Sequence, residues 1–460
     1  MKTPLPLLVT NGWDPPLRRL KATHPELEII TVTESVDLRS ASEQIARALL
    51  SGRQVRQRLV EADDQWLQQA MQVGGSVFAQ TVGTFRSKSD EWLDNILRGG
   101  RALLSRPSAS RLAGCFPGTR AVVLGAGPSL DRVAPELPRL CSGAITIAAG
   151  SALLPLQRLG IAPNIACLIE GQDRSEQFAS PVDLSTAVMV LAQHGHPAHW
   201  RAPAYTLIRA DLSENAWFTR FAGRAATLAS GGNVGAFAVL LAAHLGCREI
   251  VVAGLDFSQQ ADADHAQGAT SPRFGEAAGE SLEIEGFAGE PVRSSALLVS
   301  YRTNLEGIVN QLRARTRVIN VAGRGAARIS GTTEAEACDL PAATVTIDVP
   351  AEEAIAARVE DATLPIEGTL REGLDSIARE WRALSNLADR LRDEQAEASI
   401  WRARFGAWLA RRPGSWGGVL LAGFVLDLNA DPQTVVRERL AAGATWLRDY
   451  RAQLGFGPGN

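Results

Sequence analysis

The sequence predicts an α/β protein whose mostly parallel central sheet is covered by helices on both faces. Three observations carry this prediction. Short apolar runs alternate with helical segments between residues 119 and 340, which is the pattern of a parallel sheet. Two further apolar runs before residue 33 indicate a small N-terminal α/β region, and amphipathic patterns after residue 369 indicate a C-terminal helical domain.

Length and composition are those of a multidomain globular protein. The chain has 460 residues, with 45% hydrophobic and 21% charged residues. We place domains at 1–107, 108–342 and 343–460, and expect the central one to carry a Rossmann-like sheet. The net charge of −3 gives no reason to expect nucleic acid as a partner.

The cysteines and the apolar segments point to the cytoplasm. The five cysteines lack CxxC spacing and read as reduced residues. The N-terminal stretch is too short and proline-broken for a signal peptide, and the most apolar window, 416–426, is shorter than the roughly 20 residues that span a bilayer. We therefore expect a cytoplasmic protein without a membrane span.

The N-terminal region is expected to contain two strands and two helices. The strands are LPLLVT at 5–10 and LEIITV at 27–32. Apolar residues recur at helical spacing over 41–71 and again over 89–104, so we predict a helix in each range. The segment 105–118 reads as a connector.

Seven apolar runs are the expected strands of the central sheet. Ligands of such sheets bind beyond the C-terminal ends of the strands, so the residues that follow each run are candidate site residues. The runs are AVVLGA at 121–126, AITIAA at 144–149, NIACLI at 164–169, AVMVLA at 187–192, AYTLIR at 204–209, EIVVAG at 249–254 and RVINVA at 317–322.

The first of these runs passes into a glycine turn, GAGPSLD at 125–131. Gly125 and Gly127 allow close backbone approaches, and Pro128 suits a first helical turn. The N–H groups of a helix that starts near Ser129 attract a phosphate, which suggests a nucleotide-linked ligand. Leu130 replaces the third glycine of a dinucleotide fingerprint, and no Gly-Lys-Ser/Thr of a P-loop follows. An ordinary strand-to-helix turn remains the alternative.

Further candidate residues follow other strands. Gly150 and Ser151 follow the second run, and Glu170 follows the third, where capping of a helix is its alternative role. A second phosphate-compatible turn precedes a strongly apolar helix and comprises Ser230, Gly231, Gly232 and Asn233.

Asp256 follows the sixth run in EIVVAGLDFS, and a polar loop with Asp262, Asp264 and His265 comes after it. A carboxylate and a nearby histidine can orient a sugar hydroxyl, bind Mg²⁺ or form an acid/base pair, and the spacing does not choose among these roles. Solvated carboxylates are the simpler explanation, so no metal is assigned, although Mg²⁺ is compatible with the loop.

The stretch QHGHPAHW holds His194, His196 and His199. We reject a zinc site there, because neither a partner cysteine nor an HExxH helix accompanies the three histidines.

A hairpin at 286–295 and a helix at 300–315 complete the central domain. Beyond it we expect helices at 370–391, 405–409, 419–428 and 435–454. These helices either stabilise the core or a homo-oligomer, or recognise a protein partner.

Taken together, these motifs resemble those of the motility-associated-factor (Maf) flagellin glycosyltransferases, whose core is similar to that of archaeal 6-hydroxymethylpterin diphosphokinases. The resemblance rests on GAGPSLD, the turn at 150–151, SGGNVG at 230–235, GCREIVVAGLDFS at 246–258, the segment 264–266 and VINVAGRGAARISGT at 318–332.

The resemblance implies a sialyltransferase-like domain that transfers a nonulosonic acid, such as pseudaminic or legionaminic acid, from a CMP-activated donor to Ser or Thr of flagellin. It places the donor phosphate at Gly125, Gly127, Pro128 and Ser129, and the nucleotide beside Gly150, Ser151 and Glu170. Residues 230–233 form the other wall, and Asp256 and His265 are the expected catalytic residues. Glu170 stands where the family commonly has Asp, and Ala263-Asp264 replace its usual Lys-Thr.

Two other functions stay open. One is ATP-dependent diphosphate transfer to a hydroxymethylpterin, in which the loop after Asp256 would bind Mg²⁺. The other is a non-catalytic scaffold or chaperone that binds flagellin.

Overall fold

The structure is a computed structural model of the chain. It describes residues 6–34, 41–42, 44–45, 48–49, 54–99, 106–179, 182, 184, 187–200, 204–207, 228, 232–260, 265–269, 282–345, 347, 350–357, 366–410, 431–453 and 455.

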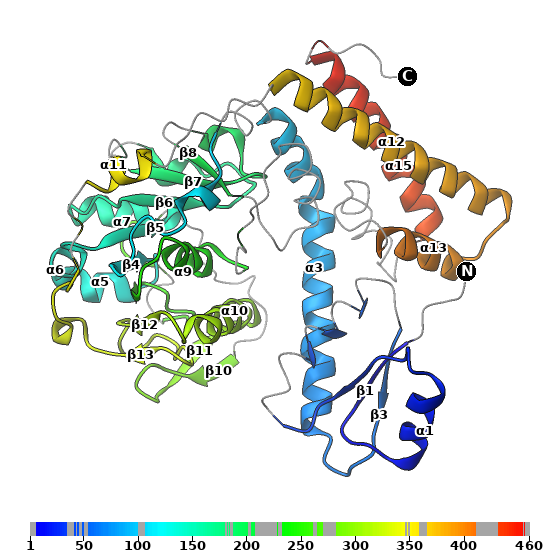
Figure 1. The fold of residues 1–460 in the computed structure, drawn as a ribbon, viewed down its shortest axis with the longest axis horizontal. Helices are drawn as coiled ribbons and strands as arrows, with labels where there is room; N and C mark the ends of the chain where they lie inside the picture. The colour runs from blue at the N-terminus through cyan, green and yellow to red at the C-terminus, as the bar shows by residue number, and fades with distance from the viewer. Residues whose placement is uncertain are drawn as a thin grey trace. The chain divides into compact units, whose positions relative to one another are not determined.

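Contacts divide the chain into two compact units (Figure 1). The first contains chiefly Met1–Glu91 and Gly368–Asn460, and the second contains Trp92–Asn215 and Ala222–Glu367. The N-terminal and C-terminal regions thus share one unit, and the three-domain division with boundaries after 107 and 342 stays a prediction.

A small parallel sheet lies in the first unit. Its strands are β1 (Leu7–Thr10), β2 (Ile29–Thr31) and β3 (Val55–Arg58), in the order β2-β1-β3. Between β1 and β2 runs α1 (Pro15–Thr23), which begins where Asp14 accepts a hydrogen bond from the Leu17 N–H at 2.8 Å. The predicted strands at 5–10 and 27–32 are therefore present.

The single helix predicted over 41–71 is wrong. The described residues from 41 to 49 are helical, but β3 follows and pairs with β1 through the register Leu7↔Val55. The residues of β3 are VRQR, and the sequence pattern around them is that of a helix. They form a strand because they pair with β1. A new helix, α3 (Gln65–Arg98), then begins and includes most of the helix predicted at 89–104.

The described residues of the C-terminal part of the first unit form the helices α12 (Ile366–Asp393), α13 (Ala398–Ala410) and α15 (Pro432–Gln453). The Trp381 Nε1–H on α12 donates to the Leu440 carbonyl on α15 at 2.9 Å, and the rings of Trp401 and Phe405 stack on α13. The helices α12, α13 and α15 confirm the helices predicted at 370–391, 405–409 and 435–454. The helix predicted at 419–428 lies outside the described residues. None of the described helices combines the length and apolar character needed to cross a bilayer.

The second unit contains a parallel sheet of eight described strands in the order β13-β12-β9-β4-β5-β6-β7-β8. The seven strands predicted from the sequence all lie in it, and β13 was not predicted. The strands are β4 (Arg120–Leu124), β5 (Ile145–Ala149), β6 (Ile165–Leu168), β7 (Val188–Ala192), β8 (Ala204–Leu207), β9 (Glu249–Ala253), β12 (Arg317–Asn320) and β13 (Thr333–Glu334).

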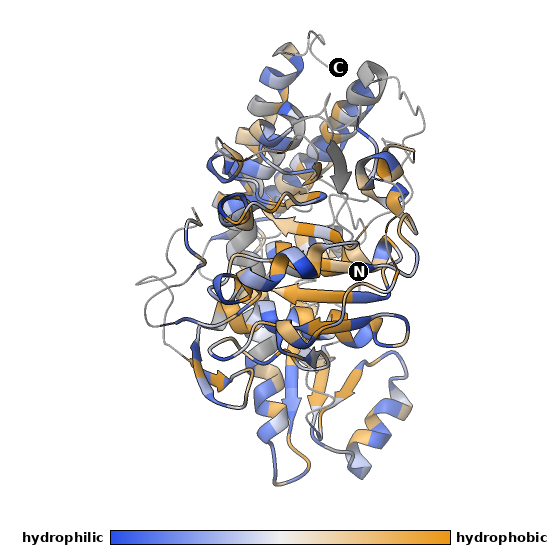
Figure 2. Cartoon of the chain, turned by 90° about the vertical axis from the view of Figure 1, so that its left-hand side faces the viewer, coloured by the Kyte–Doolittle hydropathy of each residue, from blue (hydrophilic) through white to orange (hydrophobic). Residues whose placement is uncertain are grey.

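Helices cover both faces of this sheet, as the fully buried strands require (Figures 1 and 2). One core layer packs α9 (Val234–His244) and α10 (Ala296–Leu312) against the sheet. The other packs α5 (Ser129–Val133), α6 (Leu137–Cys141) and α7 (Leu153–Arg158). The predicted α/β fold class is confirmed.

The remaining elements lie at the sheet margins. The predicted hairpin is formed by β10 (Leu282–Glu285) and β11 (Pro291–Ser294), so it begins earlier than expected. Single-turn elements are η1 (Ala109–Leu112), η2 (Ala134–Glu136), η3 (Gly150–Ala152), η4 (Ser175–Phe178), η5 (Pro197–His199), η6 (Ala337–Asp339) and the helix α11 (Ala351–Ala356).

Candidate functional site

The candidate site lies at the C-terminal edge of the eight-stranded sheet. From β4 to β8 the chain adds strands in one direction, and β9, β12 and β13 lie on the other side of β4. The strand order therefore reverses between β4 and β9. Open parallel sheets bind their ligands at such a reversal, beyond the C-terminal ends of the strands.

Asp256 and Ser129 join the two strand ends at this reversal. The Ser129 N–H donates to Asp256 Oδ2 at 2.8 Å, and the Ser129 hydroxyl donates to Asp256 Oδ1. Ser129 Oγ in turn accepts from the Gly254 N–H at 3.2 Å. Burial raises the pKa of Asp256 above its ordinary value, and the two hydrogen bonds from Ser129 oppose that rise.

The glycines of the first turn are required by this packing. A Cβ on Gly125 would lie 2.3 Å from the Gly254 carbonyl oxygen, and one on Gly127 would lie 2.6 Å from Asp256 Cγ. Both contacts are far shorter than any real Cβ contact, and both involve groups that are held in place. The close backbone approaches indicated by the sequence are therefore those between this turn and the end of β9.

The Asp256 carboxylate occupies the start of α5. This helix is only five residues long, so its dipole is small. Its Ser129 N–H, expected to face a donor phosphate, already donates to a carboxylate. The phosphate-binding roles of Gly125, Gly127, Pro128 and Ser129 stay predictions, and a phosphate here would need other donors or would compete with Asp256.

His265 lies beside the same turn. The N–H of the next residue, Ala266, donates to the Ala126 carbonyl at 2.7 Å, and the Gln267 N–H donates to Asp131 Oδ2 at 2.8 Å. The His265 side chain is half-buried. Asp262 and Asp264 lie outside the described residues, as do Ser230 and Gly231 of the second turn.

The second turn ends at the start of α9, an eleven-residue helix. Asn233 caps it, since its Oδ1 accepts from the Ala236 N–H at 2.9 Å. Gly232 has φ +83°, the left-handed region that favours glycine, and a Cβ there would meet the Asn304 side chain at 2.4 Å.

Leu255 connects the two glycine turns. Its Cδ2 would lie 2.5 Å from a Cβ on Gly125 and 2.6 Å from a Cβ on Gly235 in the first turn of α9. The glycines thus let one buried leucine pack against both segments. Gly125 and Gly235, 110 positions apart in sequence, are therefore neighbours in the fold.

Tyr301 contacts the second glycine turn and is influenced by the charge of Glu170. Burial raises the pKa of Tyr301, and the Glu170 carboxylate raises it further, which places an acidic group close to the phenol. The Tyr301 carbonyl accepts from Asn233 Nδ2 at 3.4 Å. Tyr301 was not among the predicted site residues, because only the tertiary packing of α10 brings it beside Glu170.

Gly150 begins η3 directly after β5, followed by the half-buried Ser151. A Cβ on Gly150 would lie 2.4 Å from Gln177 Oε1. This oxygen is buried and has no hydrogen-bond partner among the described residues. Gln177 therefore lies beside Gly150, which is predicted to contact the nucleotide. The sequence did not indicate Gln177 as a site residue.

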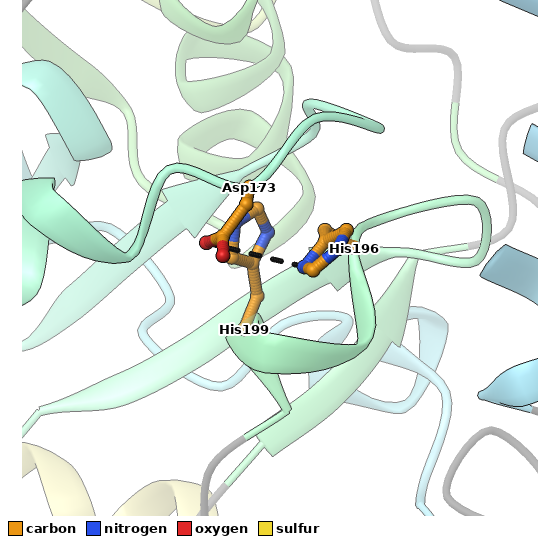
Figure 3. A group of neighbouring side chains, drawn as sticks. All are labelled: Asp173, His196 and His199. Carbon is orange, nitrogen blue, oxygen red and sulfur yellow. Dashed lines mark ion pairs between the residues drawn. The ribbon is translucent and has the colours of Figure 1, made fainter. Parts of the chain in front are cut away.

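The three histidines of QHGHPAHW separate into two environments. His194 Nε2 contacts the Ile169 carbonyl at 3.0 Å, and its ring centroid lies 4.9 Å from that of Trp92. His196 and His199 instead lie near Asp173, which follows β6 (Figure 3). Burial, reinforced by His196, lowers the pKa of His199 to about 4, and the ring is therefore neutral at pH 7.

The fold defines a doubly wound α/β protein, and its candidate ligand-binding edge lies at the reversal of strand order. Residues 94–262 match the family model described as 6-hydroxymethylpterin diphosphokinase MptE-like. The fold is similar to the solved structure of the MAf glycosyltransferase from Magnetospirillum magneticum AMB-1, with a TM-score of 0.62. The two chains are 18% identical, and the similarity covers 96% of this chain and 72% of that one. No curated protein matches the chain.

These findings confirm the resemblance that the sequence motifs indicated. The MptE-like match spans β4 to β9, which includes both glycine turns and Asp256. The similarity to the Maf structure extends over almost the whole chain and establishes the fold.

Proposed function

We propose that this protein is a glycosyltransferase that moves a nonulosonic acid from its CMP-activated form to serine or threonine side chains of flagellin. The observation that carries the proposal is the fold, which is similar to that of a Maf glycosyltransferase over 96% of this chain. The motif resemblance supplies the donor and the acceptor class. A cytoplasmic location is part of the same prediction.

The reaction needs stabilisation of a departing phosphate. Breaking the bond between the anomeric carbon and the phosphate oxygen of CMP leaves positive charge on the sugar and negative charge on the nucleotide. The N-terminus of α9 offers N–H groups in a helix long enough to have a substantial dipole. We therefore assign the phosphate to the space between residues 230–233 and the turn at 125–129, with Gly150, Ser151 and Glu170 along the nucleotide.

The acceptor hydroxyl must lose a proton as its oxygen bonds to the anomeric carbon. We assign His265 as the general base, because its unperturbed pKa of about 6.5 suits proton transfer near neutral pH. Asp256 is buried and engaged with Ser129, and we assign it a role in positioning the turn that precedes α5.

The second candidate is diphosphate transfer from ATP to a hydroxymethylpterin. The MptE-like match favours it, but that match covers only residues 94–262. The fold similarity to a glycosyltransferase also includes the N-terminal sheet and the C-terminal helices. Such additions suit a macromolecular acceptor better than a pterin.

Calorimetric titration with CMP, CTP and ATP, with and without Mg²⁺, separates the two candidates. We expect CMP to bind, whereas magnesium-dependent ATP binding without CMP binding would favour the diphosphokinase. Intact-mass measurement of flagellin from cells with and without the protein tests the transfer itself. An unchanged mass would exclude flagellin glycosylation and leave the non-catalytic scaffold as the alternative.

The residue assignments need a separate test in a purified transfer assay. His265→Ala should abolish most transfer while CMP still binds. Asp256→Asn should lower both donor binding and transfer, because the turn it holds would shift. Transfer that is unchanged in both variants would show that these two roles are misassigned.

A further inference from the structure

Three side chains with metal-ligating atoms converge outside the predicted donor site. Asp173 lies on the segment after β6, and His196 and His199 lie on the segment after β7 (Figure 3). One ligand atom of each residue lies within 4.8 Å of the others. Asp173 Oδ1 is 3.9 Å from His196 Nδ1 and 4.0 Å from His199 Nε2.

Each ring has one nitrogen near this centre, and a backbone N–H occupies the lone pair of that nitrogen, so a metal ion would have to displace both N–H donors. His199 Nε2 accepts from the Arg174 N–H at 2.9 Å, and His196 Nδ1 accepts from the Ala198 N–H at 3.3 Å. An accepting nitrogen is unprotonated, so each ring is in the tautomer that binds metals. His199 is also wholly buried, which keeps its ring neutral.

Asp173 supplies the negative charge. Hydrogen bonds from the Ser175 hydroxyl and N–H lower the pKa of Asp173 below its ordinary value. Both bonds reach Oδ1, which is also the oxygen that lies 3.9 Å and 4.0 Å from the two ring nitrogens. The neighbouring Arg174 guanidinium faces Gln172 and Glu176, at 3.3 Å and 3.6 Å.

We propose that Asp173, His196 and His199 bind a divalent transition-metal ion of the zinc class. Zinc ligands lie about 2.0–2.2 Å from the ion, so ligand atoms of a tetrahedral site are about 3.4 Å apart. The two separations from Asp173 Oδ1, 3.9 Å and 4.0 Å, need to shorten by about 0.5 Å, and Asp173 and the half-buried His196 both lie on surface segments. Two imidazoles favour zinc over magnesium, which prefers oxygen ligands.

The proposed ion would tie the segments after β6 and β7 together. Among the described residues three protein ligands converge, and Asp173 is exposed, so water or a ligand of the protein can complete the coordination. The Arg174 N–H would exchange its bond to His199 for water. The sequence-based rejection of zinc considered His194, His196 and His199 together, whereas the cluster in the folded chain excludes His194 and includes Asp173.

The test is titration of chelator-treated full-length protein with Zn²⁺ by calorimetry. We expect one ion per chain, and a Kd at least about tenfold higher in His196→Ala and in Asp173→Asn. His24→Ala, which removes an exposed histidine in the first unit, is the matched control and should bind as the wild type does. These substitutions are at surface positions, and far-UV circular dichroism checks that each variant is folded.

Cobalt replacement gives a second measurement, since the five cysteines offer other ligands. Bound Co²⁺ should show ligand-field absorption without a thiolate charge-transfer band, and His199→Gln should weaken that absorption. The proposal is overturned if no Zn²⁺ binds, if the ligand variants bind as tightly as wild type, or if the cobalt spectrum shows thiolate ligands.

Discussion

The Ser129 N–H donates a 2.8 Å hydrogen bond to Asp256 Oδ2 across the point where the order of the strands reverses. The contact joins the turn after β4 to the end of β9, residues that are 127 positions apart in sequence. Asp256 is 4% exposed, and its carboxyl group accepts both hydrogen bonds of Ser129 at the start of α5. The geometry of the candidate site therefore depends on this pair.

Ser129→Ala should destabilise the second unit by about 1–3 kcal/mol, because Asp256 Oδ1 would lose its hydroxyl donor in a buried position. Urea denaturation at pH 7 measures the change. The exposed Ser330→Ala is the control and should change stability by no more than about 0.5 kcal/mol. Equal midpoints for the two variants would mean that the Ser129 hydroxyl contributes nothing to holding Asp256.

The adjacent pair Gly74 and Gly75 in α3 should respond in opposite ways to alanine. A Cβ on Gly74 would lie 2.6 Å from Ile45 Cγ2, whereas nothing lies within 4 Å of one on Gly75. Gly75→Ala should stabilise the first unit by about 0.5–1 kcal/mol, since alanine has the higher helix propensity. Gly74→Ala should destabilise it by about 1–3 kcal/mol.

Thermal unfolding of both variants beside the wild type checks this pair. The two changes are chemically identical and one residue apart. A difference in the sign of the change in stability therefore reflects the different surroundings of the two glycines. If both variants gained stability, the packing of Ile45 against this turn of α3 would be refuted.

Gly443→Ala should disrupt the packing of α15 on α12. A Cβ there would lie 1.9 Å from Trp381 Cζ2, and the same ring donates to the Leu440 carbonyl at 2.9 Å. We expect a loss of about 2–4 kcal/mol, because neither helix backbone nor a buried indole moves easily. Urea denaturation measures the loss.

A smaller ring should relieve this clash. The double variant Gly443→Ala/Trp381→Phe should lose less than the sum of the two single losses, by about 1 kcal/mol or more. Strict additivity would indicate that the two residues are not in contact.

The sequence predicts the strands of the large sheet better than the chain on either side. The strands β4, β6 and β9 are short, mostly apolar and buried runs bounded by turn residues, so local pattern suffices. β3 could not be predicted, since VRQR becomes a strand only by pairing with β1. Its residues alone fit the helical spacing of the segments around it.

The sequence predicts only those parts of the candidate site that have a local pattern. The glycine turns have local sequence signals, but the partner of the Ser129 N–H does not, because Asp256 arrives from a distant strand. Asp173 and Tyr301 likewise acquire their neighbours only in the folded chain.

His244 should make the second unit sensitive to acid. Burial lowers its pKa below the ordinary value of 6.5, against hydrogen bonds to the carbonyls of Ser110 and Ala109 that favour the charged ring. The unfolded chain then binds this proton more readily than the native one. The neutral His244 ring therefore makes its full contribution to the free energy of unfolding above about pH 6.5. This contribution is lost as the pH falls towards the pKa of His244 in the native protein.

His244→Gln isolates this contribution, since the glutamine amide can still donate to the Ser110 carbonyl, which His244 Nε2 contacts at 3.0 Å. Urea midpoints at pH 7.5 and pH 5, in chelator, should fall less on acidification in this variant than in the wild type. His24→Gln, an exposed histidine beside Glu26, should keep the wild-type dependence. A steeper loss in His244→Gln than in the wild type would mean that the charged ring is stabilised at this position, because only a native pKa above the unfolded one gives that sign.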